Sequence, residues 1–338
     1  MIDLRSGAVF VQTNDADSNA VVAFGRDSDG RLSTAGTFST GGRGNGTPHL
    51  PSQGSLVADG GRLFVVNAGS DDVSVFAIEA GGLKLLARSS AAGSGPRSVA
   101  VHGDLVYVLG HDGIAGFRLA ADGGLTAIAT SPLSASEADG AQIAFAPGGK
   151  TLVVTERVTD RISTYEVQGD GTLEGPFANA SSGPTPYGFD FAGSTLVVTE
   201  AFGGQVGAAA ASSYRLNGGP ELEAVSASVQ DTRSEVCWAA ASKDGHFVYV
   251  TNFGDGTISS YGVGADGRLV LLEPVAASTR LGEKGIRDEA FSADGRFLYA
   301  LDADSQQVFG FTLAAEGALS PLGAVDGLPA TVAGLAAV

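Results

Sequence analysis

One sequence motif recurs seven times along this chain and constrains the fold more than any other feature. Each copy carries an aromatic residue at the end of a strand-like segment: Phe24, Phe76, Phe117, Tyr165, Tyr214, Tyr261 and Phe311. A leucine follows each aromatic residue in step: Leu32, Leu83, Leu125, Leu173, Leu222, Leu269 and Leu319. The aromatic residues are 52, 41, 48, 49, 47 and 50 positions apart. Such a period indicates a fold built from copies of one supersecondary unit.

Each unit contains short strands rather than helices. Segments such as Leu63–Asn67 and Val73–Ala77 are runs of β-branched and aromatic residues, bounded by Gly, Asp, Asn and Ser, as antiparallel strands require. Four strands in a repeat of this length are typical of a propeller blade. The sequence therefore predicts an all-β, seven-bladed β-propeller with four antiparallel strands per blade, formed by residues 1–338 as a single domain.

Asp-Gly pairs mark the turns between these strands. One series, predicted between the third and fourth strands of a blade, begins at Asp29, Asp122, Asp170 and Asp266. A second series, predicted between the first and second strands, begins at Asp59, Asp244 and Asp294. Glycine adopts positive φ without steric cost, so these aspartates are interpreted as turn formers rather than as functional carboxylates.

The two ends of the chain predict how the ring closes. The first strand-like segment, Ala8–Gln12, has the pattern of a second strand, so the first blade lacks its innermost strand. The C-terminal segment Thr331–Val338 is expected to supply that strand. The first blade would then be shared by both termini, which removes exposed sheet edges.

Charge and composition exclude several classes of partner. The net charge of −17 and the pI near 4.5 repel phosphate backbones and anionic lipid surfaces, so neither nucleic acid nor membrane is expected as a partner. The single cysteine, Cys237, excludes an intrachain disulfide and a cysteine-based zinc site. The N-terminus lacks the apolar region of a signal peptide, so we expect a soluble protein, either cytoplasmic or exported with its signal removed.

The loops at one end of the ring are the expected place for function, because binding residues concentrate in loops on rigid scaffolds. Loops that join successive blades carry one group of candidates: Arg43, His49, Arg97, Glu137, Asp139, Arg233, Glu235, Arg280, Lys284, Arg287 and Asp288. The ends of the second strands carry another: Asn14, Asn67, His111, Glu156, Glu200, Asn252 and Asp302. Glu156 and Glu200 occupy matching positions in adjacent blades and are expected to face arginines across the channel.

The sequence gives two indications about metal binding. The four histidines, His49, His102, His111 and His246, show no His-x-His or His-x-x-x-His spacing, so no transition-metal site is predicted. Asn, Asp and Glu oxygens around a channel are instead the ligands that Ca²⁺ prefers. No cofactor is predicted apart from this possible Ca²⁺.

Three copies of the repeat resemble a known family. The segments Gly95–Ala100, Ser242–Asn252 and Ser292–Asp302 are similar to the repeats of the lactonase propeller family, which includes propeller-type 6-phosphogluconolactonase and carboxymuconate-lactonizing enzyme. The resemblance implies a site of Arg, His and Glu residues at the channel mouth. Glu200, Arg233 and Arg287 match that pattern by position. Gln142 stands where the family has a channel histidine, and Pro186 stands where it has a second one.

Three functions follow from these residues and the resemblance. The first is a lactonase-like enzyme that hydrolyses or forms a small acidic lactone, with an anionic small molecule as substrate. The catalytic candidates are Glu200, Glu156, Arg233, Arg287 and His49, and the substrate-binding candidates are Arg97, His111, Gln142, Asn252 and Trp238. In this hypothesis a glutamate acts as base, arginines stabilise the developing charge, and His49 or His111 replaces the missing histidine. The alternatives are a non-catalytic ligand- or protein-binding propeller and a Ca²⁺-assisted lactonase.

Overall fold

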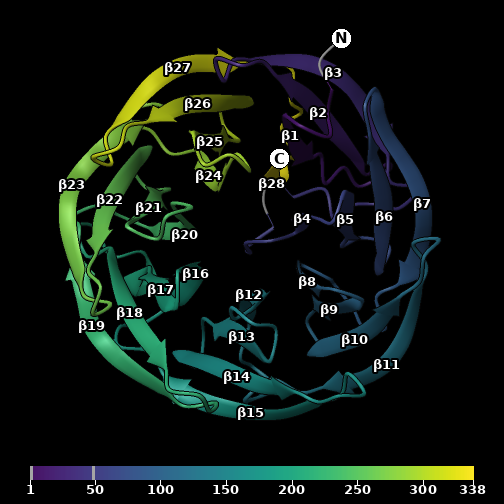
Figure 1. The fold of residues 1–338 in the computed structure, drawn as a ribbon, viewed down its shortest axis with the longest axis horizontal. Helices are drawn as coiled ribbons and strands as arrows, with labels where there is room; N and C mark the ends of the chain where they lie inside the picture. The colour runs from purple at the N-terminus through teal and green to yellow at the C-terminus, as the bar shows by residue number, and fades with distance from the viewer. Residues whose placement is uncertain (1–2, 48–49) are drawn as a thin grey trace.

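The computed structural model describes residues 3–47 and 50–338, and its strands form seven four-stranded antiparallel sheets arranged as a ring (Figure 1). Each sheet is one blade, and its four strands lie side by side in order from the channel to the outer rim. The predicted all-β fold with seven blades of four strands is confirmed. Within the described residues, the only helical segment is a single turn of 3-10 helix, η1 (Phe202–Gly204).

The strands fall into four concentric sets (Figure 1). The innermost set is β4 (Leu56–Asp59), β8 (Ser98–His102), β12 (Gly140–Phe145), β16 (Pro186–Ala192), β20 (Val236–Ala241), β24 (Ile286–Phe291) and β28 (Ala333–Ala337). The second set is β1 (Ala8–Gln12), β5 (Arg62–Asn67), β9 (Leu105–Leu109), β13 (Thr151–Glu156), β17 (Thr195–Glu200), β21 (Phe247–Asn252) and β25 (Phe297–Asp302). Residues of the second set are almost all buried, since they lie in the middle of a blade.

The third set is β2 (Ala20–Arg26), β6 (Asp72–Glu79), β10 (Ile114–Leu119), β14 (Arg161–Val167), β18 (Ala210–Leu216), β22 (Thr257–Val263) and β26 (Gln307–Leu313). The outermost set is β3 (Leu32–Ser39), β7 (Gly82–Ser90), β11 (Leu125–Ser131), β15 (Leu173–Ala180), β19 (Leu222–Gln230), β23 (Leu269–Ser278) and β27 (Leu319–Val325). The seven repeated aromatic residues lie in the third set, and each is at most 2% exposed. The repeated leucines start the outermost strands, apart from Leu83, which is second in β7.

Both chain termini contribute to the first blade, as predicted. Strand β28 from the C-terminus pairs antiparallel with β1, with Phe10 opposite Ala336 and Val11 opposite Leu335. The two strands lie together at the inner edge of this blade, where the purple and yellow ends of the chain meet (Figure 1). The ring is therefore closed by backbone hydrogen bonds between the two ends of the chain.

Among the described residues the apolar core forms eight clusters, of which seven lie one between each pair of neighbouring blades. The eighth joins Ala141, Tyr187 and Trp238 of three innermost strands. The cluster between the first and second blades, for example, joins Phe10 and Val21 to Leu63 and Phe76. Since every blade is buried on both faces, the second strands read as nearly continuous apolar runs. This packing leaves the strand ends, the loops and the channel side of the innermost strands available for polar function.

The two predicted series of Asp-Gly turns are present at the expected places. Gly30, Gly123, Gly171 and Gly267 between third and fourth strands have φ values of 86°, 93°, 87° and 79°. These positions are left-handed, which explains why the repeat requires glycine there. The structure also shows no helix long and apolar enough to cross a membrane in the ranges that it describes.

Candidate functional site

The first residues of the innermost strands and the last residues of the second strands meet at one end of the channel, because paired strands are antiparallel. Gly140 at the start of β12 is opposite Glu156 at the end of β13, and Val236 of β20 is opposite Asn252 of β21. We call this end the channel mouth. It is formed by the loops in which the sequence places most of the polar candidates.

Asp139 holds two arginines at the mouth. Its Oδ1 accepts a 2.6 Å bond from Nη1 of Arg97, and its Oδ2 accepts a bond from Nη2 of Arg157. Arg97 also donates to the backbone oxygen of Gly140 at 3.1 Å, and its side chain is only 4% exposed. One carboxylate thus orients two guanidinium groups and leaves the cluster with a net positive charge.

Aromatic side chains continue this cluster into the neighbouring blades. The Arg157 guanidinium lies 5.2 Å from the ring centre of Tyr187, and the Tyr187 ring lies 5.6 Å from that of Trp238. Arg287 lies 4.7 Å from the ring of Phe253, which packs against the same apolar group. Cation–π contacts of this kind fix guanidinium groups while leaving their N–H edges available.

Three buried polar atoms in this cluster have no hydrogen-bond partner among the described residues: Nε of Arg157, Nε of Arg287 and the Tyr187 hydroxyl. Burial raises the pKa of Tyr187 well above its usual value, and the positive charges of Arg157 and Arg287 oppose that rise. Burial also lowers the pKa of Arg287. Buried donors without acceptors cost free energy, so this arrangement is suited to an anionic or carbonyl-bearing ligand.

His111 extends the cluster on the other side of Arg97. Nη2 of Arg97 contacts both ring nitrogens of His111, at 3.1 Å for Nε2. A guanidinium can only donate, so the ring must accept and is therefore neutral. Burial and then the charge of Arg97 lower the pKa of His111, in agreement with a neutral imidazole. The ring lies on the exposed side of the cluster.

The two glutamates at second-strand ends have a different environment. Glu200 is fully buried, and its carboxylate accepts bonds from the Gly183 amide at 2.8 Å and from the hydroxyls of Ser212 and Ser228 at 2.6 Å each. Glu156, also fully buried, accepts from the Ser134 amide at 3.0 Å. Both carboxylates fasten the loop that arrives from the preceding blade.

Two further candidates, Asn252 and Arg233, also take part in local contacts of the loops. The side-chain amide of Asn252 donates to Ser259 at 2.8 Å, and Arg233 pairs with Asp255 at 3.6 Å. Asn67 and Asp302, at the same position in other blades, instead accept bonds from the loop hydroxyls of Thr40 and Thr279. The polar residues at second-strand ends therefore form a recurrent joint between blades.

Side chains of the loop before β4 and of the inner strands β12 and β20 form hydrogen bonds across the channel below the mouth. The Gln53 side chain bonds both backbone groups of Ala239 in a distant blade, at 2.8 and 3.1 Å, and Trp238 donates its indole N–H to the Ser52 oxygen at 3.0 Å. Gln142 bonds both backbone groups of Phe189, at 2.7 and 3.0 Å. We call Ser52, Gln53, Gln142 and Trp238 the channel floor. His49, a catalytic candidate, lies outside the described residues.

The structure thus joins five side chains into one arc around the mouth: His111, Arg97, Arg157, Tyr187 and Arg287. Arg157 and Tyr187 were not among the sequence-based candidates. Two positional signals identify them: Tyr187 is the second residue of β16, as Arg287 is of β24, and Arg157 directly follows a second strand. Glu156, Glu200, Asn252 and Arg233 lie in the joints, while Gln142 and Trp238 belong to the floor.

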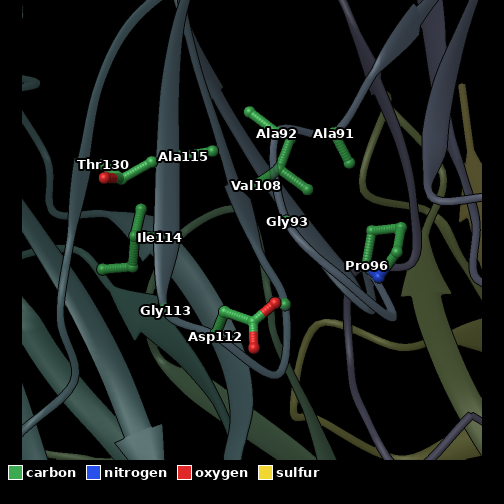
Figure 2. Close-up of a pocket in the computed structure, with 11 residues that line it drawn as sticks. Ala91, Ala92, Gly93, Pro96, Val108, Asp112, Gly113, Ile114, Ala115 and Thr130 are labelled. Carbon is green, nitrogen blue, oxygen red and sulfur yellow. The ribbon is translucent and has the colours of Figure 1, made fainter.

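A separate cavity of about 220 Å³ is lined by the third blade and by the loop that enters it from the second blade. Its lining is mostly apolar, and Asp112 is the only charged residue among the described residues that line it (Figure 2). The Asp112 carboxylate already accepts bonds from the amide and the hydroxyl of Ser94, at 2.9 and 2.6 Å. The mouth, with its unpaired donors, is the stronger candidate site. Among the described residues, no group of three or more His, Cys, Asp or Glu side chains is placed to hold a metal ion.

Fold and site together define a seven-bladed β-propeller with an arginine-rich channel mouth. Residues 2–207 and 199–326 match the sequence model of the family described as lactonase, 7-bladed β-propeller, and the chain belongs to this family. A comparison with curated proteins finds no match.

Several solved structures share the fold. A Lactobacillus plantarum protein superposes with a TM-score of 0.79 at 19% identity, covering 98% of this chain and 99% of its own. The periplasmic gluconolactonase of Pseudomonas aeruginosa gives a TM-score of 0.77 at 19% identity over the same shares of both chains. A candidate 6-phosphogluconolactonase of Bacteroides fragilis gives 0.72 at 19% identity, covering 98% of each chain. At these identities the similarity establishes the fold.

Proposed function

We propose that this protein is a lactonase that hydrolyses a small anionic lactone at the channel mouth. The observation that carries the proposal is the set of buried, unpaired donors on Arg157, Arg287 and Tyr187. A ligand with a negatively charged group and a carbonyl oxygen would supply the missing acceptors. Membership of the lactonase family and the gluconolactonase named among the structural neighbours support the same reaction class.

The arc supplies the groups that ester hydrolysis needs. Arg157 and Arg287 bind the substrate anion, and the Tyr187 hydroxyl donates to the carbonyl oxygen as negative charge develops there. Water attacks the carbonyl carbon, the ring C–O bond breaks, and the product is a hydroxy acid. Neutral His111 accepts the proton from the attacking water once its contact with Arg97 opens, and it returns that proton to the ring oxygen as the C–O bond breaks. The same groups serve ring closure in the reverse direction.

His111 is a better base than Glu200 in this site. The Glu200 carboxylate already accepts three short bonds, and it is fully buried in a joint between blades. Proton transfer to it would require those bonds to break. His111 lies at the exposed edge of the arc, and only its contact with Arg97 must open to free the unprotonated ring nitrogen.

The test is proton release from a panel of small lactones that carry a carboxylate or phosphate. We expect turnover by the wild type, and a fall in kcat/KM of about 100-fold or more for Arg157→Gln. Arg268→Gln is the matched control, because Arg268 is an exposed arginine paired with Asp266 in a turn between outer strands. Equal activity of Arg157→Gln and wild type would overturn the proposal. Activity that is lost with a chelator would favour the Ca²⁺-assisted form of the reaction.

A non-catalytic propeller is the second candidate function. The observation that favours it is the role of Gln142, which bonds the backbone of Phe189 and forms part of the floor instead of offering a base to the mouth. Such a protein would bind the same anionic lactones or hydroxy acids without turnover. Binding by calorimetry, with no proton release from any member of the panel, would establish this function in place of hydrolysis.

A further inference from the structure

A second cavity lies in the channel on the other side of the floor. Its volume is about 320 Å³, and residues of β4, β12, β16, β20, β24 and β28 line it. Gln53 and Gln142 form its end toward the mouth. At the opposite end Ala58, Phe291 and Ala337 are half-buried, so the cavity opens at the far face of the ring. We call this cavity the lower chamber.

Three carboxylates line the lower chamber: Asp190, Asp288 and Glu289. All three are partly or fully withdrawn from solvent, and the described lining contains no Lys, Arg or His. Oδ2 of Asp190 accepts the amide of Ala241 at 2.8 Å, and Oδ2 of Asp288 accepts the amide of Leu335 at 2.9 Å. These two carboxylates therefore tie their blades to the next blade.

Glu289 differs from Asp190 and Asp288 in that its carboxylate oxygens have no hydrogen-bond partner among the described residues. The Glu289 residue is only 3% exposed. A buried carboxylate in this state is costly, since its desolvation is not repaid by any bond. Burial raises its pKa well above the usual value, and the nearby charges of Asp288 and Asp190 raise it further. A cation at Glu289 would relieve all of these costs.

The rest of the lining selects what kind of cation fits. Ala239, Ala240 and Ala241 of β20 present only methyl groups, and Leu56, Leu335 and Phe189 add apolar surface. The volume equals that of roughly ten water molecules, far more than a bare metal ion needs. Two of the carboxylates are engaged with backbone amides, and no three acidic groups among the described residues are arranged as metal ligands.

We infer that the lower chamber binds a small organic cation, whose ammonium group pairs with Glu289 and whose apolar body lies against the alanines of β20. This site is separate from the mouth, because the floor lies between them. It does not depend on the proposed lactonase activity.

The test is calorimetric titration of the whole protein at pH 8 with n-butylammonium chloride, with n-butanol as the uncharged analogue. We expect saturable binding of the ammonium ion and none of the alcohol. Glu289→Gln keeps the size of the side chain and removes its charge, and it should weaken binding about tenfold or more. Glu316→Gln, in an exposed turn, should bind like the wild type. Unchanged affinity in Glu289→Gln would overturn the inference.

A second measurement uses the wild type alone. Burial raises the pKa of Asp288 to about 7 and raises the pKa of Glu289 well above its usual value, so lowering the pH removes the negative charge that attracts the ligand. Binding should therefore weaken about tenfold or more between pH 8 and pH 5. The titratable groups that face Glu289 are Asp288, Asp190 and Tyr249, on β24, β16 and β21. Affinity that does not change with pH contradicts the inference, as does binding of CaCl₂ or NaCl in place of the ammonium ion.

Discussion

At the scale of the residue, the direction in which a side chain points decides its role. Glu156 and Glu200 share one position in the repeat, and the sequence places both at the mouth, which is where their strands end. Their side chains turn into the joints because hydrogen-bond donors lie there, such as the hydroxyls of Ser212 and Ser228 in the blade of Glu200. A repeat predicts the position of a residue, but it does not predict in which direction the side chain points.

We expect Glu200→Gln to affect stability more directly than chemistry. A glutamine has one acceptor oxygen in place of two, so at least one bond from Gly183, Ser212 or Ser228 is lost or reversed. The free energy of unfolding should fall by about 1–3 kcal/mol, measured by urea denaturation. Activity per folded molecule should change little. His111→Ala provides the comparison, because it should lower kcat with little change in stability.

The opposite result for Glu200→Gln would show that Glu200, and not His111, is the catalytic base. If Glu200→Gln unfolds at the same urea concentration as the wild type but has lost turnover, the carboxylate acts on substrate. Ser228→Ala, which removes one partner of Glu200 without touching the mouth, should be destabilised in parallel with Glu200→Gln if the structural role is correct.

At the scale of the element, turns and strands could be predicted because their signals are local. The Asp-Gly pairs predicted two series of turns, and the positive φ of their glycines gives the physical reason. The contacts between blades could not be predicted, since they join separate repeats. Tyr107, Tyr249 and Tyr299 on second strands each donate a hydroxyl to a turn glycine of a following blade, at 2.8, 2.6 and 2.8 Å. This recurrent link is the clearest feature that the sequence did not reveal.

Tyr249→Phe tests this link between blades. The change removes only the hydroxyl that donates to the Gly317 oxygen and leaves the ring packed against Phe291. The carbonyl of Gly317 loses its partner, so the free energy of unfolding should fall by about 0.5–1.5 kcal/mol in urea denaturation. Tyr299→Phe should lower the free energy of unfolding by a similar amount, because the Tyr299 hydroxyl donates to the Gly30 oxygen. Phe247→Leu, on the same strand, would show whether the effect is specific to the hydroxyl. Stability equal to wild type in both tyrosine variants would mean that the link contributes nothing.

At the scale of the whole molecule, the number of blades and the closure of the ring followed from the sequence, because a sevenfold period and an incomplete first unit are global patterns. The division of the channel by a floor did not follow from the sequence. The floor is built by Gln53, which reaches across to Ala239 in a blade 186 residues away, and neither residue carries a distinctive motif. Only the closed ring brings them together, and it also separates the mouth from the lower chamber.

Closure makes the strongest prediction about the molecule as a whole. Deletion of residues 331–338 removes β28, which pairs with β1 and buries Val332 and Leu335 between the first and last blades. The loss of this apolar burial alone amounts to about 4 kcal/mol, so the melting temperature should fall strongly. The deletion also exposes the edge of β1 and removes the Leu335 amide that donates a hydrogen bond to Asp288.

A matched control carries the same eight residues fused through a flexible linker before residue 1, so that β28 enters from the N-terminal side. This permuted chain should regain most of the lost stability, because blade closure depends on the strand being present and not on the end from which it comes. A truncated protein that melts at the wild-type temperature would show that β28 does not hold the ring together.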